Sequence, residues 1–395
     1  MNYIEPSIKT RYLYSCILAN EYGGKRQNKP LLELTKHMAQ EFHDLFYTGV
    51  EIMRGSGEPE TLFPVVIGLK GDWGGLSKIG TLSRSYTRDT PTKPHGPGIC
   101  HLCRAGQKSH PWHKVDYDSM MKARQDVEPP WKRPPPLVQY IPMDVTRAAE
   151  FFRPDLFHTC HKGVSADACA NSIVTLIDFD YYPNGSFPQK LDEIYEEIQA
   201  FCKNNQKFLH MLKLTRSAIG YSSSAEYPTG SWFKGADTTV LSLFLEEKYA
   251  TLLPTCPAEL KPYFVEVHRT IRSSNEFLKG LYHADTWLTE AERRHAIESG
   301  RCFLNSFKFC AEHAFLQLNL TRWKYQPKYH LFAEVIFLLE KNLHEGVSSL
   351  NPLIEATQVD EDFVGKVSRF SLQVSVRTIS ERTIKKYLLS LASAW

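Results

Sequence analysis

The 395-residue sequence has no apolar run of the roughly 18 residues that a membrane-spanning helix needs. Its first residues, MNYIEPSIKTRYLY, include an acidic residue and a proline where a secretory leader would have a basic start and an apolar stretch. Hydrophobic residues make up 42% of the chain, enough for a large core, and the length suggests two subdomains or one core with a long insertion. We therefore expect an intracellular globular protein with no membrane partner.

The sequence also lacks the dense, even set of cysteines of a secreted disulfide-rich domain. Its nine cysteines are odd in number and scattered, so most are expected to be reduced core residues. The formal net charge of +3 is too small to indicate a nucleic-acid partner by itself. The local basic runs, each of which alone is more often a solvated helix face, are Lys132-Arg133, Arg293-Arg294, Arg322 with Lys324 and Lys328, and Lys385-Lys386.

Hydrophobic periodicity predicts two strands in the first part of the chain and helices in most of the remainder. Short apolar runs over residues 62–69 and 137–141 predict buried strands. Between them, residues 88–136 have the composition of an irregular, proline-rich loop. We expect a second loop over residues 359–365. The predicted helices cover residues 30–48, 165–177, 187–201, 240–249, 258–320 with breaks near Gly280 and Gly300, 329–343, and the chain from about 380.

Four potential metal ligands fall within fourteen residues of the irregular loop: Cys100, Cys103, His110 and His113. A Cys-x-x-Cys turn brings two thiolates to one tetrahedral ion, and the histidine pair would complete a Cys2His2 zinc site. Structural zinc suits a loop with little core of its own. The two halves are closer together than in DNA-reading zinc fingers, and no recognition helix follows, so we expect a structural role rather than base reading. The alternative is two reduced cysteines in a surface loop.

Acidic residues occur at three points where they could serve phosphodiester chemistry. Asp72 follows the first predicted strand at a glycine-rich turn, Asp155 lies three residues before His158, and Glu361 lies in the acidic segment of residues 360–362. Carboxylates that converge on two Mg2+ or Mn2+ ions can activate a nucleophile and stabilise the leaving oxygen. Convergence is not visible in a sequence, and each acid alone is more often a surface group or a helix cap.

The order of these motifs resembles cut-and-paste DNA transposases of the Kyakuja–Dileera–Zisupton and CACTA-like group. The resemblance covers about residues 62–370. It rests on Gly71-Asp72 after an apolar run, Cys100-x-x-Cys103, Asp155-x-x-His158 with Lys162-Gly163, Pro327-Lys-x-His330, and the acid Glu361.

The resemblance implies an α/β fold with an RNase H-like mixed sheet and a large, mostly helical insertion. The implied organisation is an N-terminal helical segment (1–61), a core part with the Cys/His loop (62–180), the helical insertion (181–325) and a C-terminal return to the core (326–395). The implied catalytic ligands are Asp72, Asp155 and Glu361, with Asp360 as a neighbouring alternative to Glu361, and His158 is a further candidate zinc ligand. The implied partner is DNA, which would place the protein in the nucleus, and homo-oligomers are a further option.

Two departures from that group favour an alternative function. The first catalytic Asp of the group precedes the position that Asp72 matches, but residues 1–61 contain no predicted strand that ends in Asp. An N-terminal DNA-binding domain is also not evident. The chain is therefore either a transposase-like nuclease or a truncated, catalytically inactive, transposon-derived protein that binds nucleic acid or protein. A third, less favoured hypothesis is an unrelated zinc hydrolase that uses His158, His161 and an acid.

Overall fold

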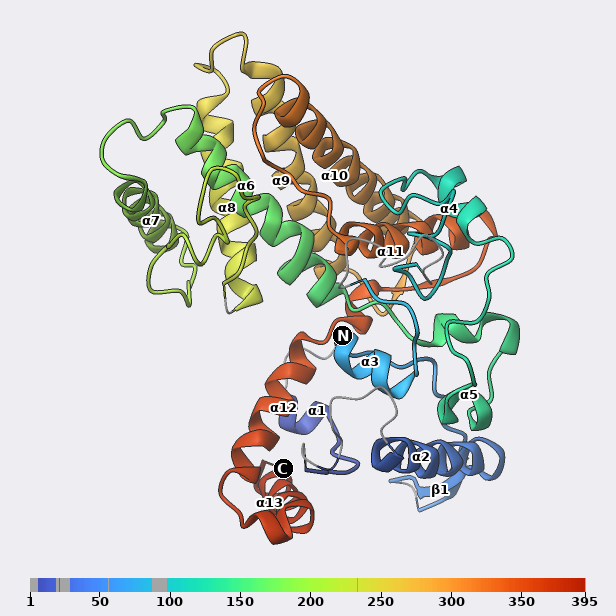
Figure 1. The fold of residues 1–395 in the computed structure, drawn as a ribbon. Coiled ribbons are helices and arrows are strands. Elements are labelled where there is room, and N and C mark those ends of the chain that lie inside the picture. Colours follow the sequence, from blue (N-terminus) through green and yellow to red (C-terminus); the bar gives the residue numbers. More distant parts are fainter. Residues whose placement is uncertain are drawn as a thin grey trace.

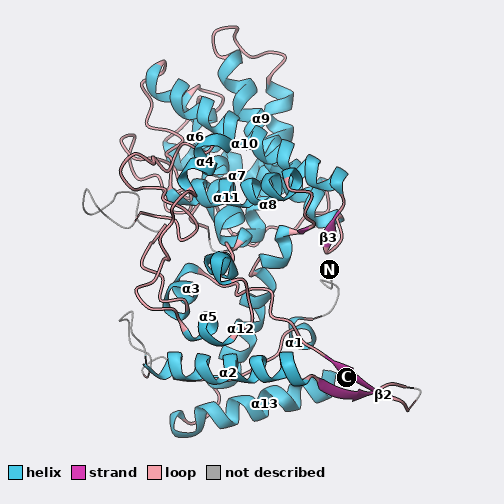
Figure 2. Ribbon diagram, turned by 90° about the vertical axis from the view of Figure 1, so that its right-hand side faces the viewer, coloured by secondary structure: helices cyan, strands magenta, loops and turns pink. Residues whose placement is uncertain are grey.

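The computed structural model describes residues 6–18, 21, 29–55, 57–86, 98–232 and 234–394, which form a mostly helical protein (Figure 1). The prediction of an RNase H-like mixed sheet is wrong. In the described ranges, the strands form only two small antiparallel pairs, β1 (Val50–Met53) with β2 (Pro59–Leu62) and β3 (Trp287–Leu288) with β4 (Ser349–Leu350) (Figure 2). Among the same residues, no helix combines the length and apolarity needed to cross a membrane.

Both predicted core strands differ from the structure. The run of residues 62–69 is extended, but Phe63, Val65 and Ile67 are exposed. Its first residue, Leu62, ends β2, and Leu69 exchanges hydrogen bonds with the Phe151 carbonyl and the Arg153 amide. Residues 137–141 are mostly in helix α5 (Pro136–Tyr140), whose first position is a proline. A short apolar run does not distinguish a strand from a buried helical turn, and an extended segment joins a sheet only where other strands pair with it.

Most of the core lies in a lobe of long helices, in the upper part of Figure 1. Helix α6 (Ser165–Asp178) is buried on nearly all sides. The other helices of this lobe are α7 (Phe187–Asn204), α8 (Gly235–Leu252), α9 (Lys261–His283), α10 (Glu290–Leu316) and α11 (Pro327–His344).

The helix breaks predicted at Gly280 and Gly300 are wrong, because both glycines lie inside helices. The chain leaves the helical conformation once between residues 283 and 290, where Thr289 caps α10 by accepting a hydrogen bond from the Glu292 amide. A Cβ at Gly300 would lie 2.6 Å from Ile336 Cδ1, so the absence of a side chain there lets α10 and α11 approach closely.

A second core cluster lies beside this lobe, around the cysteine-containing loop. It contains side chains from α3 (Trp73–Ile79), α5, the 3-10 helix of Val145–Phe151 and the cysteine loop, and Leu331 of α11 also packs in it. Helix α4 (Tyr117–Ala123) follows the loop, and α2 (Lys29–Thr48), as predicted from its stripe of apolar residues, packs against α5. Helix α11 therefore belongs to both clusters, and it is the structural link between them.

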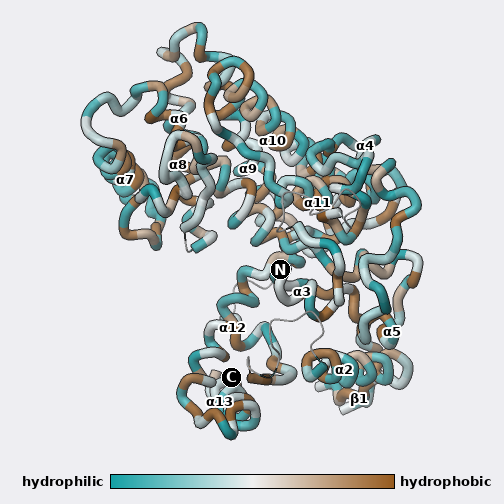
Figure 3. The backbone as a smooth tube through the Cα atoms, viewed as in Figure 1, coloured by the Kyte–Doolittle hydropathy of each residue, from teal (hydrophilic) through white to brown (hydrophobic). Residues whose placement is uncertain are grey.

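The C-terminal residues form a third small cluster with the first described helix. Helices α12 (Gln358–Ser371) and α13 (Ile379–Ala394) pack with α1 (Ser7–Thr10) around Ile8, Phe363 and Tyr387. Brown and teal alternate along α13, as expected for an amphipathic helix (Figure 3). The loop predicted over residues 359–365 is wrong, because these residues lie in α12. Short 3-10 turns, Pro352–Glu355 and Val376–Thr378, precede the two helices.

Candidate metal centre

Cys100 and Cys103 lie on a tight turn whose backbone directs amide groups at both sulfur atoms. The Leu102 amide donates to Cys100 Sγ (3.3 Å) and the Ala105 amide donates to Cys103 Sγ (3.4 Å). The turn is closed by a hydrogen bond from the Ile99 amide to the Ala105 carbonyl (2.9 Å). Gly98 has a φ of 84°, and a Cβ there would lie 2.6 Å from the Ala105 oxygen, so the turn requires glycine at this position.

The partners of these cysteines come from helix α11, more than 200 residues further along the chain. His330 and Glu334 are one helical turn apart, so both side chains leave the same face of α11. All four side chains are buried, and one potential ligand atom from each lies within 4.8 Å of the others. Among the described residues, this is the one group of three or more such side chains that meets this criterion. The cluster could hold a metal ion.

The measured separations fit a tetrahedral ion. Cys103 Sγ lies 3.2 Å from His330 Nε2, Cys100 Sγ lies 3.4 Å from Glu334 Oε1, and His330 Nε2 lies 3.2 Å from Glu334 Oε1. Zinc–sulfur bonds of about 2.3 Å and zinc–nitrogen or zinc–oxygen bonds of about 2.0 Å give tetrahedral edges of roughly 3.3 to 3.8 Å. The four atoms are therefore slightly closer together than the edges of a loaded zinc site.

Hydrogen bonds with neighbouring groups orient the His330 and Glu334 side chains. His330 Nδ1 lies 3.0 Å from the Trp112 carbonyl oxygen and donates to it, so Nε2 is the ring nitrogen that faces the sulfur atoms. The second oxygen of Glu334 accepts a hydrogen bond from Arg124. Two thiolates and one carboxylate around a divalent ion leave one net negative charge, which the Arg124 guanidinium offsets.

The pKa values of the four groups are strongly interdependent. Burial disfavours the Cys100 thiolate, but hydrogen bonds from Cys103 and His330 outweigh it and lower the pKa of Cys100 to about 5. Burial, and then the neighbouring Cys100 thiolate, raise the pKa of Cys103. Burial lowers the pKa of His330, yet its hydrogen bonds to Cys100 and Glu334 raise it to about 10. The cluster thus favours a negative charge on the Cys100 sulfur with cationic His330 beside it.

The histidines predicted as zinc ligands lie elsewhere. His110 is in the turn that follows the cysteines, where its amide donates to the Gln107 carbonyl, and His113 is exposed beside the ring of Tyr325. His158 lies next to Asp155. Sequence reasoning named His330 only through the transposase resemblance and missed Glu334. The available signal was a carboxylate inside the apolar run of α11, because a buried carboxylate requires a cation or strong donors.

The structure brings two of the three predicted catalytic acids to the same histidine. Asp155 contacts His158 Nδ1, and Glu361 Oε1 lies 3.0 Å from His158 Nε2. Both carboxylate oxygens of Asp155 have protein partners. Oδ1 accepts hydrogen bonds from the amides of Phe157 (2.9 Å) and Thr357 (3.0 Å). Oδ2 accepts one from the Thr357 hydroxyl (2.6 Å) and also faces His158. Asp155 therefore orients the His158 ring, and only Glu361 has an exposed carboxylate at this site.

Asp72, the third predicted catalytic acid, has a different position, at the start of helix α3. It is exposed, and its carboxylate caps helix α3 by accepting a hydrogen bond from the Gly75 amide (2.7 Å). Asp72 and Asp155 share one neighbour: burial first, and then both negative charges, raise the pKa of Tyr86. In the described ranges, Asp72, Asp155 and Glu361 do not form a compact group of ligand atoms.

His161, the second histidine of the hydrolase hypothesis, is buried in the π-helical segment of Phe157–Val164. Its Nδ1 has no hydrogen-bond partner among the residues that the structure describes, and its Nε2 lies 3.5 Å from the Tyr282 hydroxyl. Comparison of the chain with family models, curated proteins and solved structures finds no match.

The buried His161 ring predicts a measurable acid sensitivity. Burial lowers its pKa to about 4, from about 6.5 in an unfolded chain. The unfolded state then binds more protons, so this ring reduces the free energy of unfolding as the pH falls from about 6.5 to about 4, by at most roughly 1.4 kcal/mol per pH unit. We expect His161→Gln to lose a smaller part of its stability than wild type between about pH 7 and about pH 5, measured by urea unfolding.

Asp167 acts in the opposite direction, because burial raises its pKa to about 7, and its contribution to stability is lost as the pH rises toward that value. Since wild type and His161→Gln both retain Asp167, the difference between their pH profiles isolates the histidine. Equal profiles for the two proteins would contradict the assignment.

Proposed function

We propose that the chain is a zinc-stapled, transposon-derived helical protein that binds nucleic acid without catalysing a reaction on it. The observation that carries this proposal is the buried cluster of Cys100, Cys103, His330 and Glu334, which ties the cysteine turn to helix α11. Two thiolates and an imidazole suit zinc among the common divalent ions. The order of the Cys-x-x-Cys and Asp-x-x-His motifs supports the transposon origin, and DNA is the partner that it implies.

The geometry of the acids supports the non-catalytic alternative. Both oxygens of Asp155 are occupied by protein donors, and the carboxylate of Asp72 caps a helix. Two-metal catalysis requires carboxylates that bridge ions roughly 4 Å apart. One of the three predicted ligands, Glu361, has an exposed carboxylate, and it faces His158.

Two measurements test the proposal. Elemental analysis of the protein as purified is expected to give about one zinc per chain, and a fluorescein-labelled oligonucleotide is expected to bind with an affinity that falls as salt rises. A metal content near zero, with thermal unfolding unchanged by a strong chelator, would refute the zinc staple. Failure to bind single-stranded or duplex DNA and RNA at low salt would refute the nucleic-acid function.

One observation favours a second candidate, metal-dependent DNA cleavage: Asp155 and Glu361 flank the two ring nitrogens of His158. If the acids ligate Mg2+ or Mn2+, supercoiled plasmid should be nicked in the presence of Mn2+, and Glu361→Gln should reduce the nicking rate at least tenfold. Asp360→Asn is the matched control, since Asp360 pairs with Lys70 and Arg11 instead of His158. Nicking by wild type and Asp360→Asn but not by Glu361→Gln would establish catalysis and overturn the non-catalytic proposal.

A further inference from the structure

A large pocket lies next to the metal centre, on the outer side of the segment that follows the cysteines. Its volume is about 700 Å3, within the usual size range of small-molecule sites. Residues 113–119 form one wall, helix α10 forms another, and the start of α11 closes the third side. The lining combines aromatic rings with basic side chains, most notably His113, Tyr325, Lys114 and Lys308.

The aromatic part of the pocket is a pair of adjoining rings. The rings of His113 and Tyr325 have centroids 6.0 Å apart and an interplanar angle of 30°. Tyr325 is half-buried and is supported from behind by the buried ring of Tyr329, whose centroid is 5.0 Å away. His113 is exposed. A flat aromatic group can stack on such a pair with little loss of side-chain entropy, because the rings are already held in place.

The basic part of the pocket has cations that the protein does not neutralise strongly. Lys114 makes no ion pair with any residue that the structure describes. Lys308 lies 3.8 Å from Glu312, and both side chains are more than half exposed, so this pair contributes little. Arg301, by contrast, is committed to Glu340 and to the Val115 carbonyl oxygen. The acid nearest to Lys114 in sequence, Asp116, caps α4.

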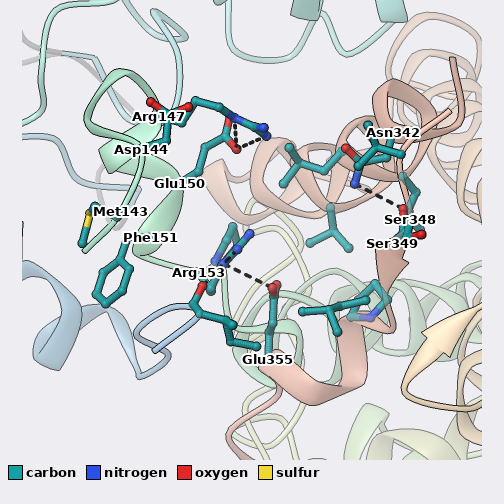
Figure 4. A pocket seen from close by; sticks show the side chains of 18 of the residues that line it. Met143, Asp144, Arg147, Glu150, Phe151, Arg153, Asn342, Ser348, Ser349 and Glu355 are labelled. Carbon is teal, nitrogen blue, oxygen red and sulfur yellow. Dashed lines mark hydrogen bonds and ion pairs between the residues drawn. The ribbon is translucent and has the colours of Figure 1, made fainter. Parts of the chain in front are cut away.

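The pocket shown in Figure 4 differs in this respect, although it is also lined by two arginines and has a volume of about 440 Å3. Arg147 forms hydrogen bonds to Glu150 (2.6 and 3.1 Å), and Arg153 lies 3.5 Å from Glu355. Each guanidinium there already faces a carboxylate (Figure 4). An anionic ligand would have to compete with those carboxylates. The pocket at His113 also contains two acids, Asp116 and Glu312, but the Lys308–Glu312 pair is longer and more exposed (3.8 Å), so the competition there is weaker.

We propose that the pocket at His113 and Tyr325 binds one nucleotide of a single-stranded nucleic acid, with the base on the two rings and a phosphate near Lys114 and Lys308. This inference rests on the proposed function for the class of partner and assigns it a site. A concave pocket of this size can receive a base only after it has left a duplex stack. A free mononucleotide has the same chemistry but brings only one phosphate, so we expect a strand to bind more tightly.

The metal centre supports one wall of this pocket. The Trp112 carbonyl accepts the hydrogen bond from His330 Nδ1, and His113 is the next residue. A metal ion on His330 Nε2 would fix that ring and hence the position of the segment that presents His113 and Lys114. Removal of the metal should therefore weaken strand binding.

The test is fluorescence anisotropy with a labelled 15-nucleotide oligothymidylate and the full chain. Replacement of both Lys114 and Lys308 by alanine should weaken binding about tenfold near 0.1 M salt and reduce the salt slope by roughly one to two. Tyr325→Leu should weaken binding about tenfold through lost stacking, with little change in the salt slope. The matched control replaces two exposed lysines on other helices, Lys203 and Lys279, by alanine and should bind like wild type.

Thermal unfolding of each variant verifies that it is folded, and His113→Ala gives a second stacking probe at an exposed position. Wild-type strand binding that is unaffected by the Lys114, Lys308 and Tyr325 substitutions would overturn this inference and leave the proposed function standing. Binding of duplex but not of single strands would do the same. Absence of all nucleic-acid binding would overturn both. Tighter binding of thymidine monophosphate than of the oligonucleotide, lost in the double lysine variant, would support the pocket and assign it to a free nucleotide.

Discussion

Cys103→Ser is expected to lower the zinc content from about one ion per chain to below roughly 0.1 and to destabilise the protein more than substitution of a cysteine outside the cluster. The Cys103 sulfur lies 3.2 Å from His330 Nε2 in a fully buried site. Loss of one thiolate removes a ligand, and it leaves Glu334 and Arg124 buried beside an incomplete site. Structural zinc contributes on the order of 10 kcal/mol to the folding of small zinc domains. Elemental analysis and thermal unfolding give the two readouts.

The matched control is Cys310→Ser. Cys310 is as deeply buried as Cys103, but it lies in the main helical core near the Thr270 hydroxyl and outside the metal cluster. It therefore measures the general effect of replacing a buried cysteine by serine, and its zinc content should equal that of wild type. His330→Ala and Glu334→Gln should both lose zinc, whereas His110→Ala should retain it. Zinc loss in His110→Ala, or its retention in Cys103→Ser, would contradict this ligand set.

Arg322→Ala is expected to reduce the free energy of unfolding by about 3 to 5 kcal/mol, the range found when one partner of a buried ion pair is removed. The Arg322 guanidinium is buried. It donates two hydrogen bonds of 2.8 Å each to the Asp178 carboxylate and a third to the Tyr221 hydroxyl (3.1 Å). Burial raises the pKa of Asp178, and Arg322 opposes that shift. Without the guanidinium, the carboxylate at the end of α6 loses its charge partner. Equilibrium unfolding in urea measures the change.

Arg294→Ala is the control, because Arg294 pairs with Glu290 one turn away on α10 and both side chains are more than half exposed. We expect a change below about 0.5 kcal/mol there. Removal of both charges, with Arg322 and Asp178 replaced by alanine together, should be less destabilising than Arg322→Ala alone, because no charge is left unpaired. A double variant that loses at least the sum of the two single losses would contradict the explanation.

Residues 165–177 and 329–343 were predicted as helices and are helical, because continuous apolar periodicity over more than ten residues has few other solutions. The prediction failed for residues 62–69 and 137–141, where short apolar runs were assigned to a sheet. The family resemblance reinforced that error, because it implies a mixed sheet that the described residues do not form. The paired strands that do exist, such as β1 and β2, are four residues each and have weak sequence patterns.

The sequence by itself determined the local half of the metal site, because Cys-x-x-Cys with flanking glycines specifies a turn that directs two sulfur atoms to one point. The structure adds the contact between Asp155, which lies just before the helical segment of Phe157–Val164, and His158 within it. Only the tertiary structure decided that His330 and Glu334 complete the site instead of His110 and His113. That choice depends on how α11 packs between two core clusters, and such packing is the sum of many weak apolar contacts between residues far apart in the chain.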